Sequence, residues 1–338
     1  MSDSSARPTA LVTGAASGIA LALVRSFLSG APGLSASASA EPAYNVLLVD
    51  LSPNLSSVAA QLADKFGADR VEHVKADVTR YDELAVAFER AKKREGWNGR
   101  VNVVCAIAGI SQVFSTPDGR DPFFTSARLS PDGSAPAAPN LKVIDVNLNG
   151  VLNTVHLAVA YFRAQPLDER TQTRGRIVCA GSLASLYPFP NESLYGAAKH
   201  GVLGAVRSLA VTLAPEGINI NAIAPSLVDT NIGNAEAFTA IKKMGLATPM
   251  EQVVKAVRIL TAGEAPATTL TGQILEICLS HLFLRAPPRI PHADEHRCMD
   301  VCHPVAELDR TVGAWRDEGV RRWLEGVGVT VVGEGEGA

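Results

Sequence analysis

The sequence has few of the residues that mark several classes of protein. Aromatic residues make up 5% and charged residues 19% of the 338 residues, and 31 basic residues stand against 34 acidic ones. Proteins that bind nucleic acid usually carry a basic excess, so we expect no nucleic-acid partner. The hydrophobic residues reach 47%, enough for a large core, which excludes a wholly disordered chain.

Long hydrophobic runs and targeting signals are also missing. No stretch approaches the roughly 18 consecutive apolar residues that indicate a transmembrane helix, so no membrane partner is expected. Residues 1–8 lack the basic and then apolar layout of a signal peptide, and residues 333–338 match no anchor or address motif. We therefore expect a cytoplasmic protein.

Cysteine is scarce and odd in number, with five residues. Cys105, Cys179 and Cys278 lie inside apolar runs that are typical of strands. This placement favours buried free thiols in a reducing compartment over a disulfide framework.

Seven short runs rich in Val, Ile and Leu alternate with segments of helical periodicity. This alternation predicts an α/β protein with a parallel sheet covered on both faces. The predicted strands are Thr9–Thr13, Asn45–Asp50, Val71–Ala76, Val101–Ala108, Gly175–Ala180, Ile218–Ile223 and Gln273–Leu279, and the predicted helices include Asp82–Arg94, Leu141–Phe162 and Leu194–Ala214.

Three connections are longer than usual, and their positions give them different meanings. Gly30–Tyr44 and Ala164–Arg174 follow helices, so they belong at the edge of the sheet away from ligands. Ser115–Asn140 has five prolines and two Asp-Gly pairs and follows a strand. We expect this insertion to shape a substrate pocket at the carboxyl ends of the strands.

The segment Thr13–Ala20 joins the first strand to the first helix. Its glycines, Gly14 and Gly18, let the backbone approach a pyrophosphate that the helix N-terminus attracts. An ordinary strand-to-helix turn would look similar, but Asp50 ends the second strand, where a carboxylate can accept hydrogen bonds from the adenosine ribose. Because no Arg or Lys follows Asp50 directly, NAD is favoured over NADP.

Tyr195 and Lys199 lie one helical turn apart, on the same face. A phenol with a pKa near ~10 is a poor base, but an adjacent ammonium stabilises the phenolate and brings it into range for proton transfer. Ser182 follows a strand, so its hydroxyl can hold a substrate oxygen beside the phenol, and Asn147 places an amide within a helical pattern. The alternative is an exposed tyrosine and a solvated lysine.

Taken in order along the chain, these motifs resemble the short-chain dehydrogenase/reductase family over about residues 8–280, with Asp77 and Asn221–Pro225 completing the set. The resemblance implies a single seven-stranded, doubly wound Rossmann domain over residues 1–285, with strand order 3-2-1-4-5-6-7 and a C-terminal extension over residues 286–338. It also implies a homodimer or homotetramer that pairs through the long helices.

The same resemblance assigns four catalytic residues. Tyr195 is the general acid/base, and Lys199 lowers its pKa and binds the nicotinamide ribose. Ser182 positions the reacting oxygen, and Asn147 holds a water that links Lys199 to solvent. The implied NAD-binding residues are Gly14, Ser17, Gly18, Ile19, Asp50, Asp77, Val78, Ala108, Gly109, Tyr195, Lys199, Pro225, Val228 and Thr230.

Three positions depart from the family pattern. The third glycine of the first loop is Ala20, the Asn-Asn-Ala-Gly motif is replaced by Ala106–Gly109, and Pro-Gly becomes Pro225-Ser226. We therefore expect local changes in the cofactor loops. Within the family, residues 247–257 and 270–277 resemble NAD-dependent 15-hydroxyprostaglandin dehydrogenase-like members.

We expect an oxidoreductase that interconverts a secondary alcohol and a ketone with NAD. Apolar residues in the loops after the fourth, fifth and sixth strands favour a mid-sized apolar small-molecule substrate. Two alternatives stay open, an NADPH-dependent biosynthetic ketoreductase and a non-catalytic dinucleotide-binding sensor. The intact set of Ser182, Tyr195 and Lys199 argues against the sensor, because binding alone needs no acid/base pair.

In the last 53 residues, 286–338, the alternation of apolar runs and helical segments ends. His and Cys residues between His292 and His303 could ligate zinc, but their spacing matches no usual zinc pattern, so no metal is expected. A helix is predicted over Val305–Leu324, where Trp315 and Trp323 would dock it onto the domain.

Overall fold

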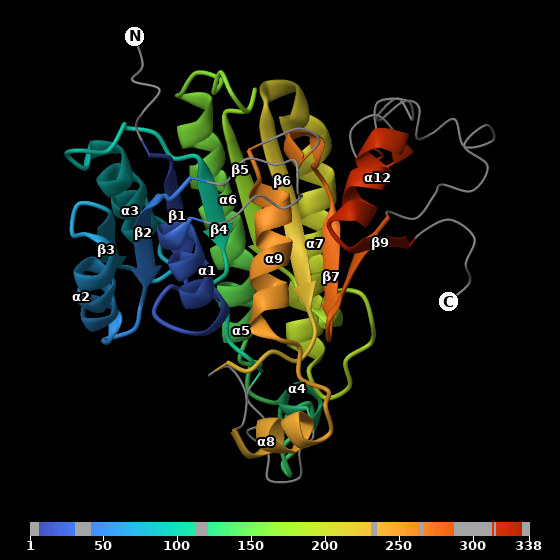
Figure 1. The fold of residues 1–338 in the computed structure, drawn as a ribbon. Coiled ribbons are helices and arrows are strands. Elements are labelled where there is room, and N and C mark those ends of the chain that lie inside the picture. Colours follow the sequence, from blue (N-terminus) through green and yellow to red (C-terminus); the bar gives the residue numbers. More distant parts are fainter. Residues whose placement is uncertain are drawn as a thin grey trace.

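The computed structural model describes residues 7–30, 42–112, 121–230, 235–263, 267–286, 313 and 316–332 (Figure 1). Most of the predicted linker at Gly30–Tyr44, the start of the Ser115–Asn140 insertion and the His/Cys stretch around residues 292–303 lie outside the described residues, as does Trp315.

One sheet organises the fold. In the described residues its nine strands follow the order β3-β2-β1-β4-β5-β6-β7-β8-β9, and β1 to β7 pair with one another in parallel. The parallel α/β architecture and the predicted order of these seven strands are confirmed. The strands are β1 (Thr9–Thr13), β2 (Asn45–Asp50), β3 (Val71–Lys75), β4 (Val103–Ala106), β5 (Gly175–Ala180), β6 (Ile218–Pro225), β7 (Ile274–Cys278), β8 (His281–Arg285) and β9 (Val329–Val332).

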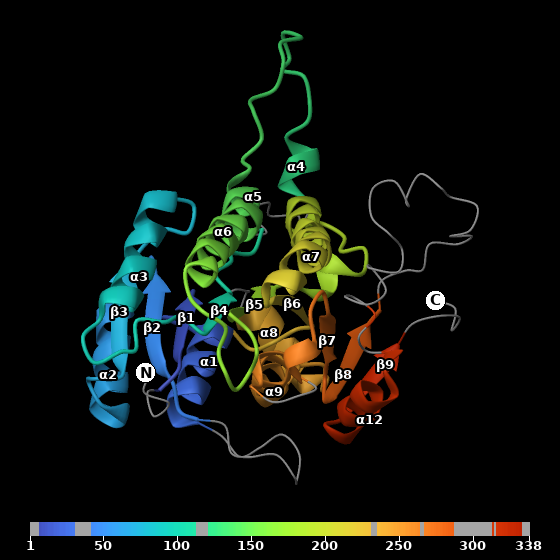
Figure 2. The same ribbon diagram turned by 90° about the horizontal axis from the view of Figure 1, so that it is seen from above.

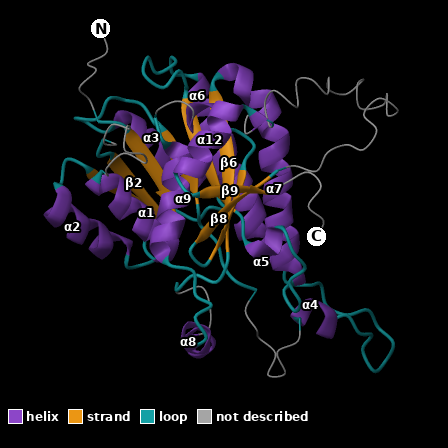
Figure 3. Ribbon diagram, turned by 45° about the vertical axis from the view of Figure 1, so that its right-hand side comes forward, coloured by secondary structure: helices purple, strands orange, loops and turns teal. Residues whose placement is uncertain are grey.

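Helices cover both faces of the sheet (Figure 2). The first face carries α1 (Gly18–Ser29), α2 (Leu55–Phe66), α9 (Met250–Thr261) and α12 (Glu318–Gly326). The second carries α3 (Tyr81–Lys93), α6 (Gly150–Arg163) and α7 (Ser193–Leu213). The short α4 (Pro122–Thr125) and α8 (Ala235–Lys243) extend beyond the carboxyl ends of the strands, as Figures 1 and 3 show.

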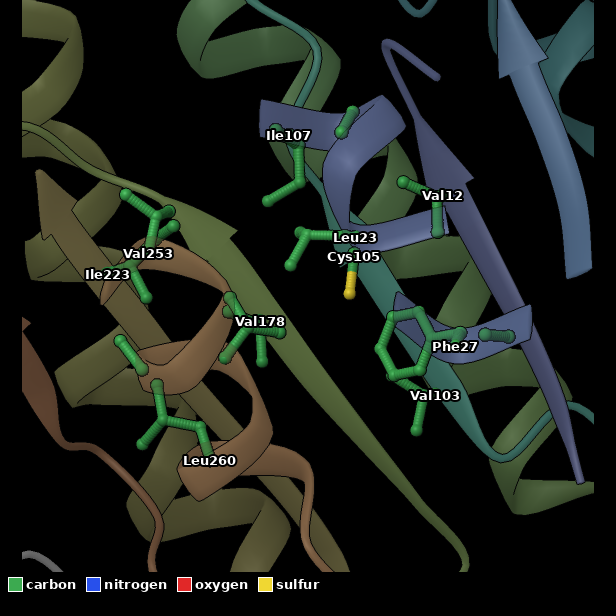
Figure 4. Close-up of a cluster of buried hydrophobic side chains, with 14 of the residues drawn as sticks. Val12, Leu23, Phe27, Val103, Cys105, Ile107, Val178, Ile223, Val253 and Leu260 are labelled. Atoms are coloured by element: carbon green, nitrogen blue, oxygen red, sulfur yellow. The ribbon is translucent and has the colours of Figure 1, made fainter. Parts of the chain in front are cut away.

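The continuous apolar composition of the strands follows from this double cover. Successive side chains of a strand point to opposite faces, so Ala10 and Val12 of β1 join one hydrophobic cluster and Leu11 joins the other. Figure 4 shows Val12 with Leu23 and Phe27 of α1 above the sheet. A strand buried on both faces therefore shows no polar alternation in the sequence.

The predicted total of seven strands is wrong. The chain reverses after β7 through Leu279 and Ser280, and Leu279 has a φ of 53°. β8 then pairs antiparallel with β7, and β9 pairs parallel with β8. Tight hairpin turns usually contain Gly or Asn, and this reversal contains neither. The sequence therefore did not predict β8 and β9.

Residues 316–332 pack onto the end of this sheet. Within α12, Val320 and Leu324 are buried in the hydrophobic cluster that includes α1 and α9, and Val327 and Val329 join the same cluster. Trp323 is partly buried against it. Most of the first half of the predicted helix Val305–Leu324 lies outside the described residues, and α12 ends two residues after the predicted end, at Gly326.

The predicted helix Leu141–Phe162 contains an irregular turn. It consists of α5 (Lys142–Ile144), the π-helical segment η1 (Asp145–Asn149) and α6. By length and composition this run could cross a membrane. Its side chains Val151, Val155 and Phe162 are, however, buried against the sheet, as in a core helix of a folded domain.

The packing of α12 predicts that it contributes to the stability of the whole domain. Leu324→Ala should lower the free energy of unfolding by about 2–5 kcal/mol, since the fully buried side chain leaves a cavity. Urea unfolding followed by circular dichroism measures this change. Glu325→Ala, at an exposed position of the same helix, is the matched control and should stay close to the unsubstituted protein. Equal midpoints for both variants would contradict a shared core.

Candidate active site

The predicted site residues gather at the carboxyl edge of the parallel strands. Thr13, Asp50, Ala106, Ala180 and Pro225 end five neighbouring strands. Ligands of open parallel sheets bind beyond this edge, so the fold places the predicted cofactor and catalytic residues on one side of the molecule.

The turn between β1 and α1 is shaped for close approach. Gly14 has a φ of 74°, and a Cβ there would lie 2.9 Å from the Cα of Ala108. Gly18 has a φ of 55°, and a Cβ there would lie 3.3 Å from the side chain of Thr230. Any larger residue at these glycines would be strained and crowded.

The N-terminus of α1 suits an anion. Ser17 is the N-cap residue, but its side chain makes no capping hydrogen bond in this described segment. The first turn, which includes Ile19, therefore presents backbone N–H groups and the positive end of the helix dipole. These features fit a dinucleotide pyrophosphate.

Thr13 is a residue that the sequence analysis missed as a contributor. Its Oγ1 accepts hydrogen bonds from the backbone N–H groups of Ile107 and Ala108, at 3.0 and 3.1 Å. It thus holds the chain after β4, the stretch where the family asparagines are absent. A threonine buried at the end of a strand is the only local signal for this role.

Asp50 ties the first two strand ends together. Oδ2 accepts from the backbone N–H of Ala16 at 2.9 Å, and Oδ1 accepts from that of Ser52 at 2.8 Å. Each carboxylate oxygen keeps a further lone pair, so both can still accept hydrogen bonds from ribose hydroxyls.

Asp77 and Val78 lie after β3, where an adenine contact is predicted. The Asp77 carboxylate accepts from the backbone N–H and the hydroxyl of Thr79, at 2.9 and 2.8 Å. Val78 is buried beneath Gly150, where a Cβ would come within 2.6 Å of the valine side chain. Gly150 is therefore required for this loop to pack on α6.

Asn147 is fully buried in the π-helical segment. Its Oδ1 accepts from the Ile110 backbone N–H and its Nδ2 donates to the Ile110 carbonyl, both at 2.8 Å. A Cβ at Gly109 would lie 3.1 Å from that Oδ1. The side chain thus clamps the loop after β4, and the extra residue of a π turn, a feature frequent at functional sites, brings it there.

Lys199 is buried on α7, beside the end of β5. Its Nζ donates to the Ala180 carbonyl at 2.8 Å and lies 5.5 Å from the centroid of the Tyr195 ring. Burial lowers the pKa of Lys199 to about 8, and the nearby Cys179 thiol opposes that shift. Burial also raises the pKa of Cys179, to about 12, so this thiol stays neutral.

The Ser182 hydroxyl lies near the Tyr195 phenol and lowers its pKa. Ser182 is itself fixed, because its Oγ accepts from Ala184 N at 3.2 Å and its N–H donates to Ser185 Oγ at 3.0 Å. Burial raises the pKa of Tyr195, the Ser182 hydroxyl lowers it, and the Glu192 charge raises it, with a net increase. At neutral pH the phenol therefore keeps its proton.

The loop after β6 reaches back over the β1–α1 turn. Val228 pairs with Thr248 in an isolated parallel bridge, and the Thr248 hydroxyl accepts from Leu279 N at 2.9 Å. Two residues further along, Thr230 meets Gly18. Pro225, Val228 and Thr230 are thus brought to the predicted cofactor edge.

Apolar side chains predicted to surround the substrate are unevenly placed. Phe124 and Met244 are 67% and 63% exposed on α4 and beside α8, beyond the strand ends. Leu129 is 70% exposed, in a segment that projects from the molecule between α4 and α5 (Figure 2). The Tyr187 hydroxyl donates to Glu276 and accepts from Arg285 at 2.7 Å. Ile232 lies outside the described residues.

Comparisons with known proteins agree with this geometry. The family described as short chain dehydrogenase matches residues 8–239. The chain is 31% identical over 255 residues to the 5'-hydroxyaverantin dehydrogenase of Dothistroma septosporum, covering 73% of this chain and 77% of the relative. It is 33% identical over 224 residues to the (-)-trans-carveol dehydrogenase of Rhodococcus erythropolis, covering 63% and 72%.

A solved structure supports the fold. The 3-ketoacyl-(acyl-carrier-protein) reductase from Brucella melitensis, complexed with NADH, superposes with a TM-score of 0.60 at 22% identity. The match covers 80% of this chain and 96% of the other.

The Asn147 clamp predicts a local loss of stability. Asn147→Ala should lower the free energy of unfolding by about 1–3 kcal/mol, because both partly buried backbone groups of Ile110 lose their partners. Thermal unfolding measures the loss. Asn149→Ala, two residues away and exposed, controls for helix propensity and should have a far smaller effect. A loss of the same size in both variants would show that the hydrogen bonds between Asn147 and Ile110 do not contribute specifically to stability.

Proposed function

Since this chain belongs to the short-chain dehydrogenase family, we propose that it oxidises a mid-sized, apolar secondary alcohol to the ketone with NAD, and catalyses the reverse reaction. It is an oxidoreductase that acts on CH–OH groups of small molecules with a nicotinamide dinucleotide, as its relatives do. The observation that carries the proposal is the Tyr195 phenol, which lies near the Ser182 hydroxyl that lowers its pKa and whose ring centroid is 5.5 Å from the buried Nζ of Lys199.

Residues of this chain transfer the proton of the alcohol hydroxyl. The bound dinucleotide supplies the hydride acceptor. The Ser182 hydroxyl, held by its capping box, orients the substrate oxygen toward Tyr195, and in the oxidation the phenolate form of Tyr195 takes the alcohol proton. Lys199 stabilises negative charge on the phenol oxygen. Because the pKa of Tyr195 is raised, the phenolate is scarce at neutral pH. We therefore expect oxidation to accelerate as the pH rises toward that pKa, while the protonated phenol that carbonyl reduction needs is already present at neutral pH.

The preference for NAD rests on Asp50. Its carboxylate lies at the end of β2, and a second negative charge from a 2′-phosphate would be repelled there. The resemblance of residues 247–257 and 270–277 to NAD-dependent 15-hydroxyprostaglandin dehydrogenase-like members supports the same choice. We also propose that the protein is cytoplasmic and forms a homodimer or homotetramer through α6 and α7, as the family resemblance implies.

An apolar substrate is supported by the side chains beyond the strand ends. Four apolar side chains remain partly or largely exposed: Phe123 and Phe124 on α4, Phe189 after the 3₁₀ helix η2 (Leu183–Ser185), and Met244 after α8. Apolar surface near a site is typical of pockets for apolar ligands, in which a few polar groups set orientation.

A matrix of substrates and cofactors tests the whole proposal. Purified protein is incubated with NAD or NADP and with secondary alcohols of increasing apolar size, and reduced cofactor is followed by absorbance. The ratio kcat/KM should rise with apolar area at roughly 25 cal/mol per Å² buried. Faster turnover of short, charged hydroxy acids than of every apolar alcohol would contradict the substrate class.

We expect Asp50→Asn to reduce the preference for NAD over NADP. The amide keeps one of the two acceptors that Ala16 N and Ser52 N use and removes the charge, so the ratio of kcat/KM for NAD to that for NADP should fall about tenfold, equivalent to about 1.4 kcal/mol. Steady-state kinetics with each cofactor measure it. Higher efficiency with NADP in the unsubstituted protein would favour the biosynthetic ketoreductase instead.

We expect Tyr195→Phe to abolish proton transfer without weakening the binding of NAD. The ring stays and the hydroxyl goes, so turnover should fall by about 10²–10⁴-fold. Binding of NAD, measured by calorimetry, should persist. Tyr161→Phe, on α6 and away from the strand ends, is the matched control and should keep full activity. Undiminished turnover by Tyr195→Phe would assign the acid/base to another group.

A further inference from the structure

Helix α7, which carries Tyr195 and Lys199, begins without a cap of its own. Glu192 occupies the N-cap position, but its side chain makes no capping hydrogen bond. The first bond within the helix runs from Gly196 N to the Glu192 carbonyl. The N–H groups of the three residues between them therefore need acceptors from elsewhere in the molecule.

Two distant side chains supply all three acceptors. Asp121 Oδ2 accepts from Ser193 N at 2.9 Å. Gln112 Oε1 accepts from Leu194 N at 3.0 Å and from Tyr195 N at 3.2 Å. The backbone of the proposed acid/base is thus itself part of the cap.

The two capping residues form one buried unit. Gln112 Nε2 donates to Asp121 Oδ1 at 2.6 Å, and both residues are nearly inaccessible to solvent. Asp121 also accepts from Phe123 N at 2.9 Å and so begins α4. Burial raises the pKa of Asp121, but hydrogen bonds from Ser193, Phe123 and Gln112 outweigh it and lower the pKa. The carboxylate therefore stays charged at neutral pH, which suits the positive end of a helix.

Tyr195 lies in the turn that this unit holds, whereas its partner Ser182 is held independently by η2. Helix ends fray when their N–H groups lack acceptors. Movement of the first turn would shift the phenol relative to the Ser182 hydroxyl. A displacement of about 1 Å in a reacting group can cost about 10²-fold in rate.

We propose that Gln112 and Asp121 are positioning residues, which fix the Tyr195 phenol against Ser182 by capping α7 from the segment after β4. This inference rests on the proposed function for its kinetic consequence. Neither side chain needs to touch the substrate or the cofactor for this role.

Gln112→Met is the main test, because methionine matches the length of glutamine and cannot accept the two hydrogen bonds. We expect kcat to fall about 10–100-fold, while KM and the Kd for NAD change by less than about twofold. Native-state hydrogen exchange should speed up at the amides of residues 193–195 and stay unchanged in the second half of α7.

Asp317→Ala is the matched control. Asp317 caps α12 by accepting from Gly319 N and Val320 N, at 2.9 and 3.1 Å, on an element remote from the strand ends. Loss of that cap should cost about 1 kcal/mol of stability and leave kcat unchanged. A fall in kcat similar to that of Gln112→Met would show a general stability effect and overturn the proposal.

A double variant tests whether the capping hydrogen bonds matter, rather than the particular side chains that make them. In the double variant Gln112→Glu/Asp121→Asn, a carboxylate at 112 still accepts from Leu194 N and Tyr195 N, and an amide at 121 donates to that carboxylate and accepts from Ser193 N. The swap loses only the bond from Phe123 N in α4, because the amide nitrogen takes the place of Oδ1. We expect this variant to recover most of the lost kcat, and it also serves if Gln112→Met fails to fold. Failure of the folded double variant to recover kcat, or faster exchange at residues 193–195 without a fall in kcat, would overturn the proposal.

A second readout keeps this inference distinct from the proposed function. The phenol of Tyr195 is titrated by ultraviolet difference absorbance against Tyr195→Phe, without any substrate. Gln112→Met should shift that pKa, because the phenol moves relative to Ser182 and Lys199. If the unsubstituted protein oxidises no alcohol, the proposed function is wrong. If Gln112→Met leaves both the phenol pKa and the hydrogen exchange at residues 193–195 unchanged, the capping role of Gln112 and Asp121 is wrong.

Discussion

A lysine ammonium buried against the sheet is the constraint to which the rest of the site conforms. Removing such a charge from water is unfavourable unless acceptors replace its hydration, and burial accordingly lowers the pKa of Lys199 to about 8. The Ala180 carbonyl, at the end of β5, accepts one of its protons. Helix α7 must therefore pass this strand end at hydrogen-bonding distance, and that requirement sets where Tyr195 lies one turn earlier.

The parallel sheet meets this requirement because it aligns strand ends that are far apart in the sequence. The ends of β1 and β4 are joined by Thr13, whose hydroxyl accepts from two backbone N–H groups after β4. Asn147 then clamps Ile110 from the opposite side. These two polar side chains perform the loop-holding that the missing family asparagines would share. At the departure Ala106–Gly109, the backbone is thus held by the side chains of Thr13 and Asn147.

The sequence alone predicted what depends on local pattern. Apolar runs located the first seven strands to within about two residues at each end, and the spacing of Tyr195 and Lys199 placed both side chains beside each other, as the 5.5 Å separation of Nζ and ring bears out. The strands β8 and β9 were missed for a physical reason. β8 is buried on one face only, through Leu282 and Leu284, and the reversal before it lacks the residues that usually mark a hairpin.

The contacts of Gln112 and Asp121 were beyond prediction for a different reason. Each crosses more than 70 positions of the chain, and neither residue belongs to a motif with fixed spacing. Nothing in the sequence indicated that they are needed, because Ser193 precedes the predicted start at Leu194 and is itself a common N-cap residue; only the structure places Glu192 at the N-cap, without a capping hydrogen bond. Buried N–H groups must find acceptors, so a buried helix without a local cap implies a distant one. For a helix that carries a reactive phenol in its first turn, that distant cap then becomes part of the geometry of the site.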